Sequence, residues 1–126
     1  MTELKPGTVG TAEWTVLPSM TADNCGSGLL PVFSTPMLVA LMEAAACDAM
    51  LSALQAGETS VGVRIDVEHL AASPIGVSVR AEAKVTSADG RRISFEINAF
   101  EGDKLIGRAS HLRVIVNGER FMSRLG

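Results

Sequence analysis

Residues 34–54 read STPMLVALMEAAACDAMLSAL, and this stretch decides the fold. It predicts a helix, because Ser34 or Thr35 can cap the N-terminus and Pro36 can occupy the first helical position, where no N–H is needed. Gly57 is a natural stop for this helix. Apolar side chains cover most of its circumference, at Met37, Leu38, Leu41, Met42, Ala45, Met50, Leu51 and Leu54. This pattern predicts a central helix surrounded by protein.

The sequence on both sides of this helix predicts five strands. Residues 8–17 hold β-branched residues and Trp14 between two prolines, which is typical of a first strand. From residue 61 to 69 the apolar residues alternate with polar ones, so that five side chains share the inward face: Val61, Val63, Ile65, Val67 and His69. Residues 77–86, 93–99 and 105–116 continue the pattern after turns at 73–76, 89–90 and 101–103. The apolar residues of the last strand have both parities, so its faces stay unassigned.

One antiparallel sheet around one helix is the simplest arrangement of these elements, an α+β domain of hotdog type. The chain has 126 residues, of which 47% are hydrophobic and 20% charged, which predicts one folded domain over residues 1–126. Residues 21–31 lie outside the periodic segments and are rich in turn-forming residues, so they could act as a mobile flap.

Charge and leader composition exclude several classes of protein. The net charge is −3, from 11 basic and 14 acidic side chains without long runs of either sign, so no nucleic-acid partner is expected. Residues 1–10 lack the apolar core of a secretory signal, which favours a cytoplasmic location. Glu43 and Asp48 would each cost about 2.5–3.5 kcal/mol in lipid, so the helix is interpreted as a buried core helix and no membrane partner is expected.

The two cysteines do not indicate a metal site or a nucleophile. Cys25 and Cys47 lack the spacing of a zinc site, and two reduced thiols are expected. Cys47 lies among alanines without a basic neighbour, so packing is its simplest role. Arg91 and Arg92 flank a hairpin, where charged side chains are normally solvated, although they could meet a phosphate.

Glu43 is the residue in the helix that most needs an explanation. The residues three and four positions away are Val39, Ala40, Ala46 and Cys47, so no basic side chain can pair with it along the helix. A buried charge without a partner costs several kcal/mol, and the partner must therefore come from another element. Two interpretations stay open: a catalytic carboxylate, or one satisfied by backbone N–H groups or exposed at a gap in the sheet.

His69 and Thr35 are the candidate companions of Glu43. His69 closes the alternating strand on its inward face, and an imidazole titrates near neutral pH. Taken alone it is more often a hydrogen-bonded core residue, and pairing with Glu43 would make it a catalytic candidate. Thr35 most simply caps the helix, but its hydroxyl beside the helix N-terminus could also orient water or a carbonyl.

Four stretches carry a resemblance to a known family. Residues 32–43 (VFSTPMLVALME), 69–76 (HLAASPIG), 90–94 (GRRIS) and 105–113 (LIGRASHLR) resemble the fluoroacetyl-CoA thioesterase family of the hotdog superfamily. The resemblance implies a catalytic triad at Thr35, Glu43 and His69. It also implies that Gly62 and Arg113 lie near the acyl end of the substrate, and it implies no metal and no cofactor other than the coenzyme A of the substrate. Homodimers or higher homo-oligomers are implied, with the acyl-CoA site near the subunit interface.

Two positions depart from the family pattern. The family's phenylalanine lid corresponds here to residues 28–30 (GLL), which include no aromatic residue, and Pro36 stands where the family has a glycine. We therefore expect an acyl-CoA thioesterase acting on a short or substituted acyl group, with fluoroacetyl selectivity in doubt. The alternatives are a non-catalytic acyl-CoA binding protein and another hotdog activity such as hydration of an enoyl-CoA.

Overall fold

The computed structural model describes residues 4–126. The strands are β1 (Val9–Thr15), β2 (Glu58–His69), β3 (Ser78–Asp89), β4 (Arg92–Glu101) and β5 (Lys104–Asn117). The helices are α1 (Ala22–Cys25), α2 (Thr35–Met50) and α3 (Gly118–Ser123), and short 3₁₀ turns span Pro18–Met20 and Leu51–Ala53. The predicted helix and all five predicted strands are therefore confirmed, with ends that differ by a few residues.

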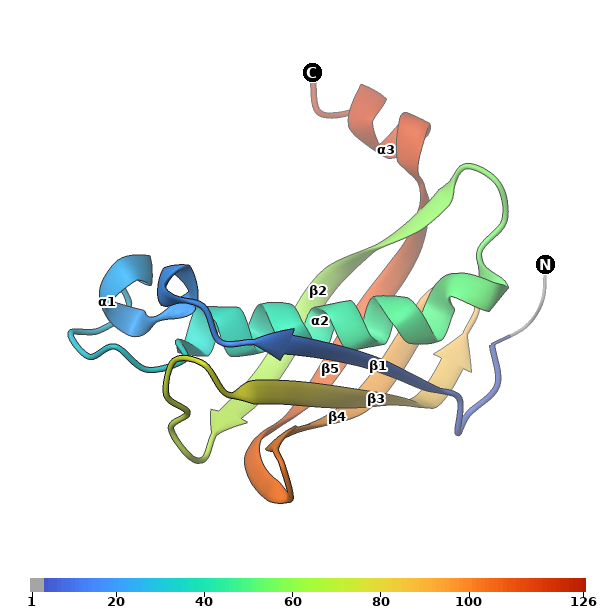
Figure 1. The fold of residues 1–126 in the computed structure, drawn as a ribbon. Helices are drawn as coiled ribbons and strands as arrows, with labels where there is room; N and C mark the ends of the chain where they lie inside the picture. The colour runs from blue at the N-terminus through green and yellow to red at the C-terminus, as the bar shows by residue number, and fades with distance from the viewer. Residues whose placement is uncertain (1–3) are drawn as a thin grey trace.

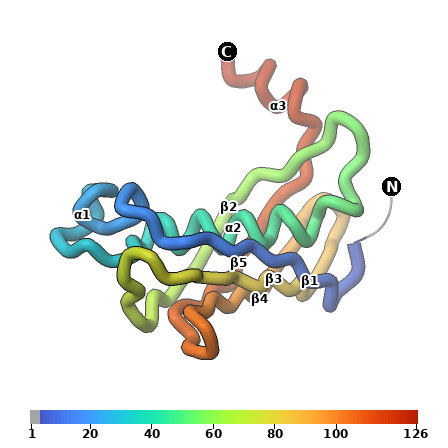
Figure 2. Tube along the Cα trace, in the orientation of Figure 1, coloured from blue at the N-terminus to red at the C-terminus, as the bar shows by residue number. Residues whose placement is uncertain are grey.

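The five strands form one antiparallel sheet in the order β1-β3-β4-β5-β2. The sheet curls, and α2 lies along its concave face (Figures 1 and 2). The inward residues of β3 and β4 alternate as predicted, since Val79, Ala81, Ala83, Val85, Ile93, Phe95, Ile97 and Ala99 are all buried. The α+β architecture with one sheet wrapped around one helix is confirmed.

Helix α2 is buried on one side only, which corrects the prediction of a helix surrounded by protein. Its buried residues are Leu38, Leu41, Met42, Ala45, Ala46, Ala49 and Met50. Its other side carries Val39, Ala40, Glu43 and Cys47, which are only partly buried. Thr35–Ala53 is long and apolar enough to cross a membrane, but its packing against the sheet is that of a core helix.

Close packing at Gly10 fixes α2 against the edge strand β1. A side chain at Gly10 would place its Cβ 2.2 Å from the Ala49 amide nitrogen and 2.3 Å from the Ala45 carbonyl oxygen. In the same region the Asp48 carboxylate accepts the Thr11 N–H at 2.9 Å. Asp48, the second acid of α2, thus satisfies a backbone donor of β1.

A bulge in β2 changes which residues face the helix. The pairing of β2 with β5 shifts between Gly62 and Arg64, so alternation restarts after the extra residue. Gly62 and His69 consequently both lie on the concave face, while Val63 is 52% exposed. The predicted inward position of His69 is confirmed. The predicted inward position of Val63 is wrong, because a strict period of two cannot continue through a bulge.

Two short helices fall in segments where the sequence gave no periodic pattern. α1 lies in the expected flap region, where Ala22 and Asp23 donate N–H groups to Val32 and Leu30. α3 follows β5, and the Asn117 side chain caps it by accepting the Arg120 N–H at 2.9 Å.

Candidate functional site

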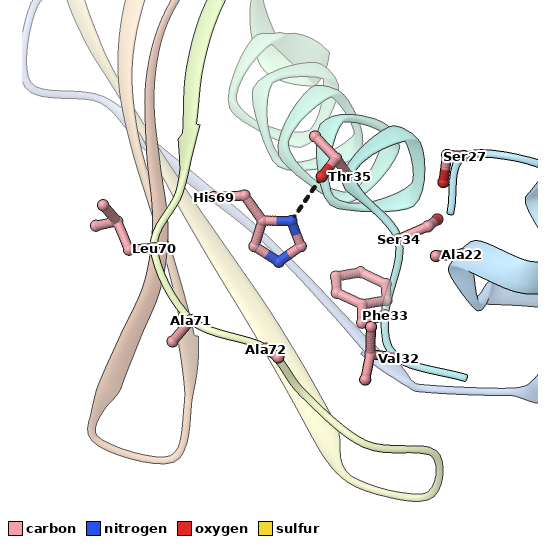
Figure 3. Close-up of a pocket in the computed structure, with 10 residues that line it drawn as sticks. All are labelled: Ala22, Ser27, Val32, Phe33, Ser34, Thr35, His69, Leu70, Ala71 and Ala72. Carbon is pink, nitrogen blue, oxygen red and sulfur yellow. Dashed lines mark hydrogen bonds between the residues drawn. The ribbon is translucent and has the colours of Figure 1, made fainter. Parts of the chain in front are cut away.

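Thr35 and His69 meet at the N-terminal end of α2. The Thr35 hydroxyl lies 2.8 Å from Nδ1 of His69, which closes β2 (Figure 3). Thr35 can make this contact because Ser34 caps the helix, its Oγ accepting the Met37 N–H at 3.3 Å. The sequence allowed either Ser34 or Thr35 as the N-cap, and the structure shows that it is Ser34. The Thr35 hydroxyl is therefore available to the imidazole.

A pocket of about 350 Å³ opens beside this pair. Its walls come from the start of α2, the chain after β2 and the segment around α1, and include Phe33, Ser34, Leu70 and Ala72 (Figure 3). The Nε2 atom of His69 is buried and has no hydrogen-bond partner among the described residues. Burial lowers the pKa of His69 below 6.5, and the nearby backbone of Ala71 opposes this only in part. The imidazole is therefore neutral at neutral pH and can accept a proton.

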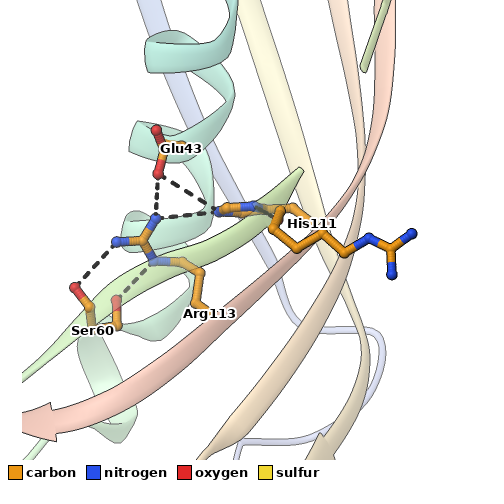
Figure 4. A network of polar contacts seen from close by, with 5 residues as sticks. Glu43, Ser60, His111 and Arg113 are labelled. Atoms are coloured by element: carbon orange, nitrogen blue, oxygen red, sulfur yellow. Dashed lines mark hydrogen bonds and ion pairs between the residues drawn. The ribbon is translucent and has the colours of Figure 1, made fainter. Parts of the chain in front are cut away.

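Glu43 belongs to a second cluster, further along α2. Its Oε2 accepts a hydrogen bond from Nη1 of Arg113 at 2.9 Å and lies 3.9 Å from Nε2 of His111 (Figure 4). The Glu43 side chain is 39% exposed, whereas that of Arg113 is only 7% exposed. The partner of Glu43 does come from another element, as expected, but within one chain it is Arg113 of β5 and not His69.

Arg113 is held by four hydrogen bonds. Its Nε and Nη2 donate to the side chain and the carbonyl of Ser60 at 2.9 and 3.1 Å, and Nη1 reaches both Glu43 and His111 (Figure 4). Such a network fixes the plane of the guanidinium and leaves the Glu43 carboxylate in one position. The predicted substrate-binding residues Gly62 and Arg113 lie together here, because a Cβ at Gly62 would fall 2.6 Å from Glu43 Oε2 and 3.3 Å from Arg113 Nη1.

His111 is a member of this cluster that the sequence did not single out. Its Nδ1 donates to the Arg64 carbonyl at 2.7 Å, so Nε2 carries the lone pair that accepts from Arg113 at 3.2 Å. Burial lowers the pKa of His111, the Arg64 bond opposes this, and the Arg113 charge lowers it further. The alternation of buried residues along β5 would place His111 and Arg113 on one face, but apolar residues of both parities hid that face in the sequence.

The sequence of the chain matches one family of known proteins. A model of the fluoroacetyl-CoA-specific thioesterases matches residues 16–119. The chain belongs to this family. The fluoroacetyl-CoA thioesterase of Streptantibioticus cattleyicolor is 39% identical over 94 residues, which cover 75% of this chain and 68% of that protein. The family prediction made from the four sequence stretches is confirmed.

Solved structures of the fluoroacetyl-CoA-specific thioesterase have the same fold. One superposes with a TM-score of 0.92 at 32% identity, covering 98% of this chain and 96% of that chain. A point mutant in complex with fluoroacetate and CoA has a TM-score of 0.87 at 34% identity, over 93% and 98% of the two chains. A thioesterase superfamily member from Thermus thermophilus has a TM-score of 0.89 at 28% identity, over 99% and 93%. The chain is a hotdog-fold homologue of thioester hydrolases.

Proposed function

We propose that this protein hydrolyses the thioester of a short acyl-CoA, with Thr35, His69 and Glu43 as its catalytic residues. The observation that supports this most directly is the 2.8 Å contact between the Thr35 hydroxyl and His69 Nδ1 at the mouth of a pocket. The reaction adds water to the acyl carbonyl and breaks the carbon–sulfur bond. The acyl group leaves as a carboxylic acid, and the sulfur takes the remaining proton to give free CoA thiol.

Thr35 and His69 supply the groups that this reaction needs near the carbonyl. Neutral His69 can take a proton from water, and positioned general bases contribute about 10²- to 10⁴-fold to a rate. The Thr35 hydroxyl can hold the attacking water or the carbonyl oxygen. The Thr35 N–H at the positive end of α2 has no acceptor in the part of the chain that the structure describes, so it can polarise the carbonyl as charge develops.

Glu43 is proposed to act as a base or as a nucleophile toward the same carbonyl. It lies eight residues after Thr35, which corresponds to a rise of about 12 Å along the helix. A small acyl thioester cannot touch both groups in a single chain at that separation. The proposal therefore requires a homodimer in which the Glu43 cluster of one copy meets the Thr35–His69 pair of the other.

Two unpartnered surfaces support this dimer. The partly exposed side of α2 is an apolar stripe of Val39, Ala40 and Cys47 around Glu43. β2 lies at the edge of the sheet, so the backbone groups on its outer side have no strand to pair with within residues 4–126. A second copy placed on this edge and stripe would bury both surfaces and bring the two clusters together.

The loop before α2 supports a substrate range that is not limited to fluoroacetyl groups. Leu29 and Leu30 are 92% and 65% exposed, and neither closes over the Thr35–His69 pocket. Because residues 28–30 include no aromatic side chain that could act as a lid, we propose that short acyl groups without fluorine are accepted as well.

The test is release of CoA thiol from a panel of acyl-CoAs that includes acetyl, fluoroacetyl, propionyl and longer chains. We expect hydrolysis of the short members by the wild-type protein and a strong loss in Thr35→Ala and His69→Ala. Saturable acyl-CoA binding without thiol release would contradict hydrolysis and favour a binding protein. Sedimentation of a monomer at assay concentration, with full activity, would contradict the shared site.

A further inference from the structure

A second pocket lies at the far end of β5, where α3 leaves the sheet. Its volume is about 190 Å³, and its walls include Arg91, Asn117, Arg120, Phe121 and Arg124. α3 projects beyond the sheet at the C-terminal end of the chain, at the opposite end of α2 from α1 (Figures 1 and 2). Three of the 11 basic residues of an otherwise acidic chain therefore line one small pocket.

Two of these arginines have no counter-charge in residues 4–126. The guanidinium of Arg91 is partly neutralised, because Nη1 lies 3.2 Å from the carboxylate of Glu58 and 3.3 Å from a backbone carbonyl. The side chains of Arg120 and Arg124 form no ion pair in the part of the chain that the structure describes. Arg120 lies in α3 and Arg124 is its C-cap, so the two like charges stand one turn apart. Glu119 is the acid nearest to them in sequence. Glu58, which lies opposite Asn117 across the sheet, is already paired with Arg91.

Phe121 adds an aromatic surface to the same pocket. Its side chain lines the cavity and is 38% exposed, so the ring is open to a ligand in the pocket. Guanidinium groups bind phosphate through paired N–H donors, and aromatic rings stack on nucleobases. Arginines and an open aromatic ring in one pocket thus match a ligand that joins a phosphate to a planar base.

We propose that this arginine pocket binds the phosphorylated adenosine end of coenzyme A. The proposal rests on the thioesterase function proposed above, since CoA is the substrate's leaving group. Arg113 and Asn117 are four residues apart on β5, a distance of about 13 Å. The acyl end beside Glu43–Arg113 and the adenosine end beside α3 are therefore within the span of an extended pantetheine arm.

The position of the pocket also fits the shared site. It lies near Glu58 at the start of β2, whereas His69 ends that strand eleven residues later, about 36 Å away within one chain. A CoA molecule held at α3 therefore meets the Glu43 cluster of its own chain and the Thr35–His69 pair of the second copy.

The test compares two substrates with the same acyl group, one on CoA and one on pantetheine, which lacks the nucleotide. In Arg120→Ala/Arg124→Ala we expect kcat/KM for the acyl-CoA, divided by that for the acyl-pantetheine, to fall about 10-fold or more. The control is Arg80→Ala/Arg108→Ala, which removes two partly exposed arginines elsewhere on the sheet and should keep the wild-type ratio. An unchanged ratio in the α3 variant would overturn the proposal.

Binding measurements separate this proposal from the thioesterase proposal. Adenosine 3′,5′-bisphosphate should bind the wild-type protein and bind the α3 variant at least 10-fold more weakly, even if neither thioester is hydrolysed. Inorganic phosphate alone should bind more weakly than the bisphosphate, because it cannot stack on Phe121. Equal affinity of the wild-type protein and the α3 variant for the bisphosphate would overturn the nucleotide assignment. So would a variant that loses binding to anionic phospholipid vesicles but binds the bisphosphate as the wild-type protein does. Unchanged thermal unfolding of the variant would confirm that the fold is intact.

Discussion

Separating Glu43 from Arg113 should destabilise the protein more than its exposure alone suggests. Arg113→Met keeps much of the apolar stem but removes the group that donates to Glu43 at 2.9 Å, while the arginine side chain is only 7% exposed. Breaking a fully buried pair costs about 3–5 kcal/mol, mostly from the stranded charge. Because Glu43 is 39% exposed, water compensates for part of this loss, and we expect a cost of about 2 kcal/mol in the free energy of unfolding.

A double-mutant cycle measures this coupling. Glu43→Gln, Arg113→Met and their combination are compared by urea unfolding at neutral pH, and we expect a coupling energy of about 1 kcal/mol or more. The matched control is the Glu68–Arg108 pair, which has a similar distance of 2.8 Å but is 58% exposed on both sides. Its coupling should lie between about 0 and 1 kcal/mol and fall with salt. Additivity at Glu43–Arg113, or equal coupling in both cycles, would refute the reasoning.

Three further predictions concern packing and titration. Gly10→Ala should destabilise the protein by about 3 kcal/mol in urea unfolding, because its Cβ would lie 2.2 Å from a backbone atom of α2. Gly62→Ala should lower kcat/KM about 100-fold in the thiol-release assay. The added Cβ would lie 2.6 Å from Oε2 of Glu43 and would force this carboxylate to move. Burial lowers the pKa values of His69 and His111, so the unfolded chain binds more protons below pH 6.5 and the free energy of unfolding should rise with pH up to about that value.

Each of these has a control that isolates its cause. Gly118→Ala meets only ordinary contacts, the nearest at 3.7 Å, and should cost far less than Gly10→Ala. A Gly62→Ala protein that keeps full activity would contradict the tight fit at Glu43. Replacing either histidine by glutamine should flatten the pH dependence below about pH 6.5, and an unchanged slope in both variants would contradict the stated titration.

The sequence carried enough information to predict the fold because its two periods do not overlap. The long apolar run of α2 between its cap and Gly57 predicts a core helix, the alternation in β3 and β4 places apolar side chains on one face of each strand, and tight turns at Gly90 and Gly102 join neighbouring strands. The bulge at Gly62 to Arg64 could not be predicted, because it is a shift in the pairing of β2 with β5 and the sequence of β2 alone carries no signal of it. It alters which valines face outward while leaving His69 inward.

The candidate site could be predicted only in part. The positions of Thr35 and His69 at the ends of two predicted elements indicate both as candidates, and the structure places them in contact. The partner of Glu43 could not be identified, since Arg113 is 70 residues away and sits in a strand with apolar residues at both parities. His111 was missed for the same reason, because only the pairing of β5 with β2 shows which face it occupies.

Thr35 and His69 are the residues proposed to carry out hydrolysis of an acyl-CoA thioester. The most direct measurement is the rate of CoA thiol release by wild-type and His69→Ala proteins at saturating acyl-CoA, over the short-chain panel. We predict turnover by the wild-type protein and a fall in kcat of about 10²- to 10⁴-fold in the variant, with the fold unchanged. Equal rates of thiol release by the two proteins would contradict the claim.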